Sequence, residues 1–217
     1  MANSDKAHLN ITFIENDLAV ADVVNTAWIG TDAITIEKYW SGKRSPNERH
    51  FTARLLWSPS ALYVRFDAAR AEPLVVSDRP DVTTKAIGLW DRDVCEIFIA
   101  PDVNEPRRYF EFEVAPTGEW LDVALDLTSG ERISHWEYSS GMETFAEIGP
   151  DSVVMTVKIP WNAFGGLGPR SGDVWLGNLF RCVGEEAGRG YLAWQPTLTS
   201  EPAFHVPEKF GEFRFVE

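Results

Sequence analysis

The sequence predicts an all-β protein, an antiparallel β-sandwich with jelly-roll or immunoglobulin-like layering and long loops at one end. Short runs of β-forming residues recur along the 217-residue chain, and clusters of Gly, Pro, Asn or Ser separate them. No stretch shows the extended apolar periodicity of an amphipathic helix. Because a sandwich of this length is common as one unit, we expect a single domain over residues 1–217.

The N-terminal part supplies the first predicted strands. Two short apolar runs, Leu9–Ile14 and Leu18–Val24, indicate an edge strand and its approach. Residues 34–39 alternate with a period of two, which favours another strand. Residues 51–57 and 61–68 are rich in β-formers and flank a Ser-Pro-Ser turn, so they predict a hairpin.

A long loop then leads to a buried strand. Residues 69–89 carry prolines and charges, and a loop of this length is often functional. After Trp90, residues 94–100 (VCEIFIA) form a nearly continuous run of β-formers, as expected for a strand packed on both faces. Alternation places Glu96 and Cys95 on opposite faces. A carboxylate in a buried strand needs a partner, which makes Glu96 a candidate functional residue.

The C-terminal half continues the pattern. Residues 107–125 predict a hairpin with a Pro-Thr-Gly turn, and a polar run follows from Thr128 to Glu147. Residues 152–161 and 174–183 are further predicted strands, and in the second of them Arg181 lies on the face opposite Phe180.

The segment from Gly190 to Phe215 is the most distinctive part of the chain. It holds two strand-like runs, Tyr191–Trp194 and Gly211–Val216. Their connection contains three prolines, which predict a stiff loop rather than a ladder of paired strands. The aromatic cluster in this region consists of Trp194, Phe204, His205 and Phe210. A stiff loop that carries planar side chains is a reasonable ligand site.

Composition and charge exclude several classes of partner. A net charge of -13 argues against nucleic acid and against an anionic membrane surface, because both require clustered Lys and Arg. No apolar run reaches the length of a membrane helix. The N-terminal residues lack the apolar region of a secretory signal, so we expect a cytoplasmic protein, or a secreted or periplasmic one if the chain is a mature or truncated form.

Two cysteines, Cys95 and Cys182, match no zinc-binding spacing, and we expect buried free thiols. A single disulfide stays open as an alternative if their strands are neighbours. No cofactor is expected, although the acidic composition is compatible with a structural calcium ion bound by loop carboxylates.

Aromatic and polar residues combine into a candidate sugar site. Sugars offer C–H faces to aromatic rings and hydroxyls to charged or amide groups. The candidate walls are Trp90, Trp194 and Phe204. The candidate polar groups are Glu96 and Arg181, with Glu111, Glu113, Gln195 and His205 as weaker candidates. A buried structural ion pair between Glu96 and Arg181 is the competing interpretation.

Two other functions stay open from the residues alone. Two of Glu96, Glu111 and Glu113 suit a small β-sandwich glycoside hydrolase, which needs a pair of carboxyl groups. His205 and Met155 are conceivable axial ligands of a haem, but the chain has no C-x-x-C-H attachment motif.

Five segments in order, DRDVCEIFIAP, YFEFEVAPTG, IPWNAFGG, WLGNLFRC and YLAWQPTLTSEPAFHVPEKFGEF, resemble the family 9 carbohydrate-binding modules in their family-9-like branch. The resemblance implies a β-sandwich related to the DOMON superfamily that binds monosaccharides, oligosaccharides or polysaccharides without cleaving them. A haem-binding domain of the DOMON type is the less favoured relative.

The resemblance also implies roles for individual residues. In the family, two tryptophans sandwich the sugar ring. Phe204 stands at one of these positions, where it keeps an aromatic wall with a smaller face, and Trp90 is the candidate for the other. The family's acid on the V-x-E-I-F strand is Glu96 here. The family's arginine on the next strand falls near Glu113, so its contact is lost or comes from Arg108 or Arg181. Trp194 and His205 are expected to support the floor of the site.

Overall fold

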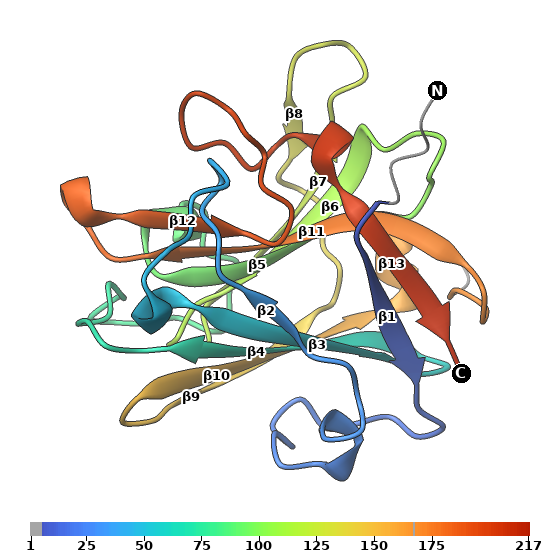
Figure 1. The fold of residues 1–217 in the computed structure, drawn as a ribbon. Helices are drawn as coiled ribbons and strands as arrows, with labels where there is room; N and C mark the ends of the chain where they lie inside the picture. The colour runs from blue at the N-terminus through green and yellow to red at the C-terminus, as the bar shows by residue number, and fades with distance from the viewer. Residues whose placement is uncertain (1–5, 167) are drawn as a thin grey trace.

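A single folded-over sheet makes up the protein in a computed structural model that describes residues 6–166 and 168–217 (Figure 1). The described residues contain thirteen strands and six short 3-10 helices and no α-helix. The strands are His8–Phe13 (β1), Ile34–Ile36 (β2), Phe51–Trp57 (β3), Ala61–Ala69 (β4), Val94–Ala100 (β5), Arg108–Val114 (β6), Trp120–Asp126 (β7), Ile133–His135 (β8), Glu143–Ile148 (β9), Ser152–Pro160 (β10), Val174–Val183 (β11), Gly190–Ala193 (β12) and Gly211–Val216 (β13). The all-β prediction is confirmed.

The strand order departs from the predicted antiparallel arrangement. Neighbours follow the path β8-β7-β6-β5-β11-β13-β1-β3-β4-β10-β9, with β12 beside β11 and β2 beside β3. β1 is parallel to both β13 and β3, so the sheet is mixed and the antiparallel prediction is wrong at this point. The edge-strand prediction for Leu9–Ile14 is wrong for the same reason, because both edges of β1 are paired. Residues 18–24 contain no strand.

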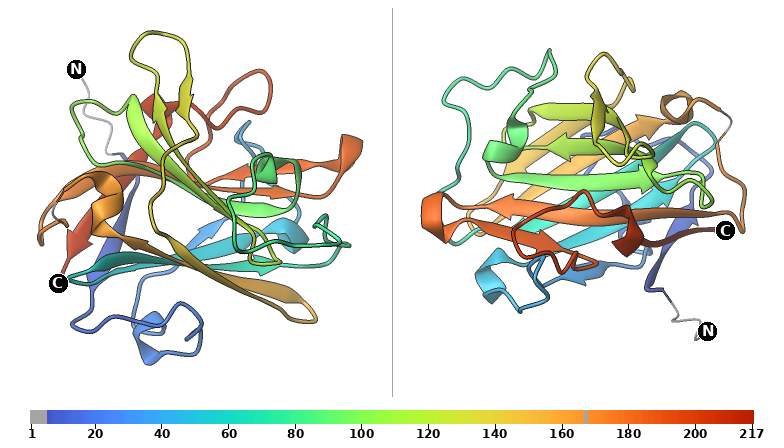
Figure 2. Two further views of the ribbon diagram at one scale, coloured as in Figure 1. Left: turned by 180° about the vertical axis from the view of Figure 1, so that it is seen from behind. Right: turned by 90° about the horizontal axis from the view of Figure 1, so that it is seen from above.

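The sheet folds at β1 and β13 into two layers that enclose the core (Figures 1 and 2). One layer contains β5, β6, β7 and β11, and the other contains β3, β4 and β10. Ile97 and Leu179 from the first layer share a buried cluster with Leu55, Val64 and Val157 from the second. Side chains of alternate residues therefore fill the space between the layers, as the period of two predicts.

A second buried cluster covers the outer face of the first layer. It contains Phe98, Tyr109 and Phe180 from the strands, together with Phe204 and Phe210 from the C-terminal connection. This connection joins β12 to β13 and lies over the sheet in Figure 2. Both predicted strands of the C-terminal segment are confirmed, as β12 and β13, and each of them pairs with β11. The loop between them packs against the sheet through its aromatic rings.

The observed strands also test the remaining secondary-structure predictions. The hairpins β3–β4 and β6–β7 and the strands β10 and β11 are confirmed. Two short strands, β8 and β9, lie within the run from Thr128 to Glu147, which the sequence analysis treated only as polar. Residues 1–5, which form part of the N-terminal segment discussed above, lie outside the described residues.

In the described part of the chain, no helix is both long and apolar enough to cross a membrane. The two cysteines are buried and free. Cys95 packs in the core between the layers, whereas Cys182 belongs to the cluster on the outer face, so the sheet itself separates the two thiols. The disulfide alternative is therefore wrong.

Candidate functional site

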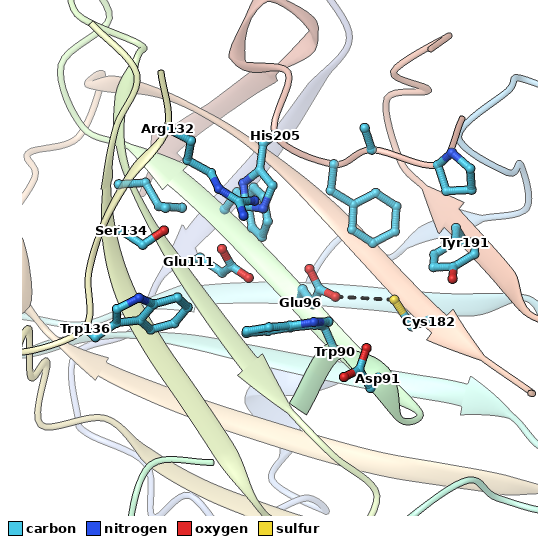
Figure 3. Close-up of a pocket in the computed structure, with 15 residues that line it drawn as sticks. Trp90, Asp91, Glu96, Glu111, Arg132, Ser134, Trp136, Cys182, Tyr191 and His205 are labelled. Carbon is cyan, nitrogen blue, oxygen red and sulfur yellow. Dashed lines mark hydrogen bonds between the residues drawn. The ribbon is translucent and has the colours of Figure 1, made fainter. Parts of the chain in front are cut away.

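A cavity of about 350 Å³ opens on the outer face of the first layer (Figure 3). The strands β5, β6, β7 and β11 supply its floor, and the turn at Trp90, the segment 132–136 and the C-terminal connection supply its walls. It combines five aromatic side chains with three carboxyl groups and one guanidinium. These residues are Trp90, Phe98, Trp136, Tyr191, Phe204, Asp91, Glu96, Glu111 and Arg132.

Trp90 is held at the rim by a short 3-10 helix, Leu89–Asp91. Gly88 precedes it with a φ of 87°, a backbone conformation that favours glycine. Leu89 is buried beneath the turn, while Trp90 is 37% exposed, so the neighbouring side chains point in different directions. Arg189 donates hydrogen bonds to the Trp90 and Arg92 carbonyl oxygens, each at 2.6 Å. The ring is therefore presented to solvent from a fixed backbone.

Trp136 is a second rim aromatic that the sequence analysis missed. It follows β8 and is 38% exposed, and its ring centroid lies 5.9 Å from that of Trp90. Arg132 and Ser134 from the same segment also line the cavity. The one signal in the sequence was a lone Trp in the polar run from Thr128 to Glu147. Its place at the cavity depends on the pairing of β8 with β7.

Phe204 and His205 form the opposite wall, from the C-terminal connection. The Phe204 ring stacks on Phe180 with centroids 4.0 Å apart and planes 13° from parallel. The His205 ring stacks on Phe98, and its Nδ1 lies 2.8 Å from the Tyr109 hydroxyl. Burial lowers the pKa of His205 to about 3, so the imidazole is neutral at physiological pH.

Three glutamates lie together at the floor. Glu96 on β5 is directly opposite Glu113 on β6, and Glu111 lies two residues before Glu113. Ligand atoms from all three fall within 4.8 Å of one another, and all three side chains are buried. Figure 3 shows the Glu96 and Glu111 carboxyl groups between the Trp90 ring and His205. Neither carboxyl oxygen of Glu113 has a hydrogen-bond partner among the described residues.

The electrostatics of the three glutamates follow from this arrangement. Burial is the largest cause of a raised pKa in each of them. For Glu96 and Glu113 the neighbouring carboxylates add to this effect, and both pKa values lie well above the ordinary range for glutamate. For Glu111 the nearby Glu113 carboxyl group acts in the opposite direction and lowers the pKa. The pKa of Glu111 is raised to about 7. At neutral pH the cluster therefore holds protons. Arg189 lowers the pKa of Glu96 and Arg132 lowers that of Glu111, but burial outweighs both.

Two sequence-predicted site residues, Arg181 and Trp194, lie elsewhere. Arg181 projects from the face of β11 that is opposite the cavity and donates to the carbonyl oxygens of Arg49 at 2.8 Å and Ala69 at 2.7 Å. Trp194 stacks on Phe213 in the core between the layers. Neither residue lines the cavity. Glu96 pairs across the strands with Phe180, so the Glu96–Arg181 ion pair does not form.

The structure thus brings together Trp90, Glu96, Phe204 and His205 of the predicted residues, with Glu111 from the weaker candidates. Arg108, considered as a replacement for the family's arginine, pairs with Asp126 at 3.0 Å on the surface. The guanidinium at the cavity is that of Arg132.

The positions of these residues bear on two possible bound groups, a haem and a calcium ion. Met155 is buried in the core between the layers, while His205 lies on the outer face, so they cannot hold one haem from opposite sides. The proposed haem pair is therefore wrong. The three glutamates are the described acidic group that is close enough to bind a hard cation. Calcium takes about 6–8 oxygen ligands, so most of its coordination would come from water or a ligand.

A two-layer all-β fold with an aromatic cavity above a polar floor defines a protein of the ligand-binding β-sandwich class. The chain belongs to the carbohydrate family 9 binding domain-like family, whose model matches residues 20–217. This agrees with the resemblance in the sequence motifs.

Solved structures share the fold at low identity. A candidate carbohydrate-binding protein from Bacteroides uniformis aligns over 97% of this chain and 100% of its own, with 18% identity and a TM-score of 0.79. A family 9 carbohydrate-binding module from Caldicellulosiruptor kristjanssonii, in complex with cellotriose, aligns over 97% of this chain and 94% of its own, with 14% identity and a TM-score of 0.69. Its glucose complex aligns over 96% and 95%, with the same identity and TM-score. No curated protein sequence matches the chain.

Proposed function

We propose that the protein binds carbohydrate without cleaving it, and that residues 1–217 act as one sandwich domain whose long loops gather at the binding end. The observation that carries this proposal is the cavity itself, where exposed indole rings stand beside buried carboxyl groups. Indole rings suit the C–H faces of a sugar ring, and carboxyl groups suit its hydroxyls.

The roles of the residues follow from their positions. Trp90 and Trp136 contact one side of the sugar ring, and Phe204 contacts it from the opposite wall. Glu96 and Glu111 bond to hydroxyl groups at the floor, and Arg132 bonds to them from the rim. Family membership supports this assignment, as do the related modules that are complexed with glucose and cellotriose.

The proposal is tested by calorimetry of the full chain with glucose, cellotriose and a broad panel of other sugars and oligosaccharides. Binding heat with a change in Trp fluorescence is expected, because two exposed indoles lie in the cavity. The absence of both signals across the panel would contradict the proposal. A Phe204→Ala variant is expected to lose most of the affinity while it stays folded.

Glycoside hydrolysis is the second candidate, because three glutamates lie within 4.8 Å of one another. A retaining glycosidase requires one ionised carboxylate as its nucleophile and one protonated acid. Burial raises the pKa of Glu96 well above its ordinary value and that of Glu111 to about 7, so neither is a fully ionised nucleophile at neutral pH. This protonation favours binding over hydrolysis. Release of reducing ends from a polysaccharide panel, abolished by Glu96→Gln or Glu111→Gln, would instead establish hydrolysis.

A further inference from the structure

The floor of the cavity has an uncompensated acidic character. Asp91, Glu96 and Glu111 line the cavity, and Glu113 lies beside Glu96 on the paired strand. Arg132 is the one Lys or Arg side chain in the lining, and it is exposed. Three carboxyl groups of the lining, with a fourth next to them, therefore face one guanidinium. A site built for neutral hydroxyls alone has no need of this excess.

Glu113 provides an independent observation at the same place. Its side chain is completely buried, and both carboxyl oxygens lack a hydrogen-bond partner among the described residues. A buried carboxyl group without a partner is costly, and such groups in native proteins call for an explanation, such as an ion or ligand that completes the site. Glu113 lies within 4.8 Å of Glu96 and Glu111, which open into the cavity. A cation bound by Glu96 and Glu111 would therefore also lie close to Glu113.

Aromatic rings surround the same space. Trp90, Trp136, Tyr191 and Phe204 line the cavity, and the faces of such rings attract cations. An ammonium group between aromatic walls and above buried carboxylates gains both cation–π and charge-assisted hydrogen bonds. Neutral hydroxyl groups gain neither charge term. The aromatic walls and the acidic floor together favour a positively charged ligand over a neutral one.

We propose that the cavity recognises an amino sugar, a pyranose whose protonated amine lies over Glu96 and Glu111 while its ring contacts the tryptophans. This inference rests on the proposed carbohydrate function and specifies its ligand class. The amine takes the position of the cation that the glutamate cluster lacks. Glu113 lies beside the two acids that line the cavity.

Proton release is a signature of this arrangement. The groups facing the cluster are Asp91 from the rim, Cys182 from β11, Tyr109 from β6 and the wall residues Arg132 and His205. Burial keeps Tyr109, Cys182 and His205 neutral. An arriving ammonium ion therefore displaces protons from the glutamates, and binding is accompanied by a net release of protons to the buffer.

The test is calorimetry of the full chain, stripped of metal with EDTA, against glucosamine, glucose and N-acetylglucosamine. Glucose replaces the amine with a hydroxyl of similar size, and N-acetylglucosamine removes the charge. Glucosamine is expected to bind at least about tenfold more tightly than either sugar. Its observed heat is expected to change between buffers of different ionisation enthalpy, which reports proton release.

Matched variants locate the effect. Glu96→Gln and Glu111→Gln are expected to remove most of the preference for glucosamine over glucose, because each removes a charge and keeps the shape. Glu147→Gln, an exposed acid on β9 outside the cavity, is expected to leave the preference unchanged. Near-ultraviolet circular dichroism verifies that each variant is folded. The wild-type sugar comparison decides the question even if a variant fails to fold.

The outcomes separate the two proposals. Equal or tighter binding of glucose would overturn the amino-sugar inference and leave carbohydrate binding intact. A complete absence of sugar binding would contradict the carbohydrate function itself, and with it the inference. Glucosamine binding that appears only after calcium is added would also overturn the inference, because the metal ion would then be the compensating cation.

Discussion

Glu96 on β5 and Glu113 on β6 stand directly opposite each other, and their side chains are 2% and 0% exposed. Like charges directly opposed across two strands destabilise a sheet. The floor of the cavity therefore contains a pair of acids that destabilises the sheet. Of the three clustered glutamates, Glu96 and Glu111 line the cavity.

Stability is expected to fall as the pH rises from about 5 to about 8. The folded-state pKa values of Glu96, Glu111 and Glu113 are raised, so the native state binds more protons than the unfolded chain above pH 4.5. For Glu111, the change from 4.5 to about 7 corresponds to about 3 kcal/mol once the pH exceeds its folded pKa. Urea unfolding at several pH values measures this, and stability that increases over the same range would contradict the raised pKa values.

Replacing Glu113 with Gln is expected to stabilise the protein at pH 8. The amide has nearly the same shape, carries no charge and can donate to the carboxylates of Glu96 and Glu111. We expect a gain of about 1–3 kcal/mol in the free energy of unfolding at that pH. The gain should shrink near pH 5, where wild-type Glu113 is protonated. Glu147→Gln serves as the control, and an equal gain in that variant would count against the explanation.

Removing the Trp136 ring is expected to weaken sugar binding by about 10- to 100-fold, because an indole that packs against a sugar ring contributes a large apolar contact area. The ring is 38% exposed, so Trp136→Ala should change the melting temperature little. Calorimetry with the best sugar of the panel measures the loss. Ile148→Ala removes an exposed apolar side chain on β9, outside the cavity, and should bind normally. Unchanged affinity in Trp136→Ala would remove that residue from the site.

Replacing Arg181 with Met is expected to destabilise the fold and leave sugar affinity unchanged. The guanidinium donates to the carbonyl oxygens of Arg49, His50 and Ala69. Its loss removes a charged donor from all three, although the His50 oxygen still accepts from the Ala69 N–H. A cost of about 2–4 kcal/mol in the free energy of unfolding is expected. Chemical denaturation and calorimetry on the folded variant measure the two effects separately. A selective loss of sugar affinity would restore Arg181 to the binding site.

The sequence predicts the part of the site that depends on local pattern. Alternation within β5 places Glu96 on the face opposite Cys95, and the structure agrees. The prolines and rings of the C-terminal connection predict a stiff aromatic wall, and Phe204 and His205 line the cavity. Trp90 reaches the rim because the turn that carries it directly precedes β5.

Long-range pairing determines the rest. Arg181 and Glu96 were matched because both are charged residues in buried strands. The β5–β11 register instead pairs Glu96 with Phe180 and places Arg181 opposite Cys95 on the other face. Trp136 and Arg132 enter the site because β8 pairs with β7, and no local pattern specifies that contact. No local pattern predicts the parallel pairings of β1 either, because its partners β13 and β3 lie far from it in the sequence.

The position of β1 has a consequence for the order of folding. His8 pairs with Glu212, so the seam between the two layers closes only after β13 has been synthesised. Contacts so distant in sequence form slowly, because a long loop must be ordered first. Until β13 has been synthesised, β1 and β11 each lack the strand that lies between them in the finished sheet. The emergence of the C-terminal strand is the event that locks them together, and it delivers the wall of the binding cavity in the same step.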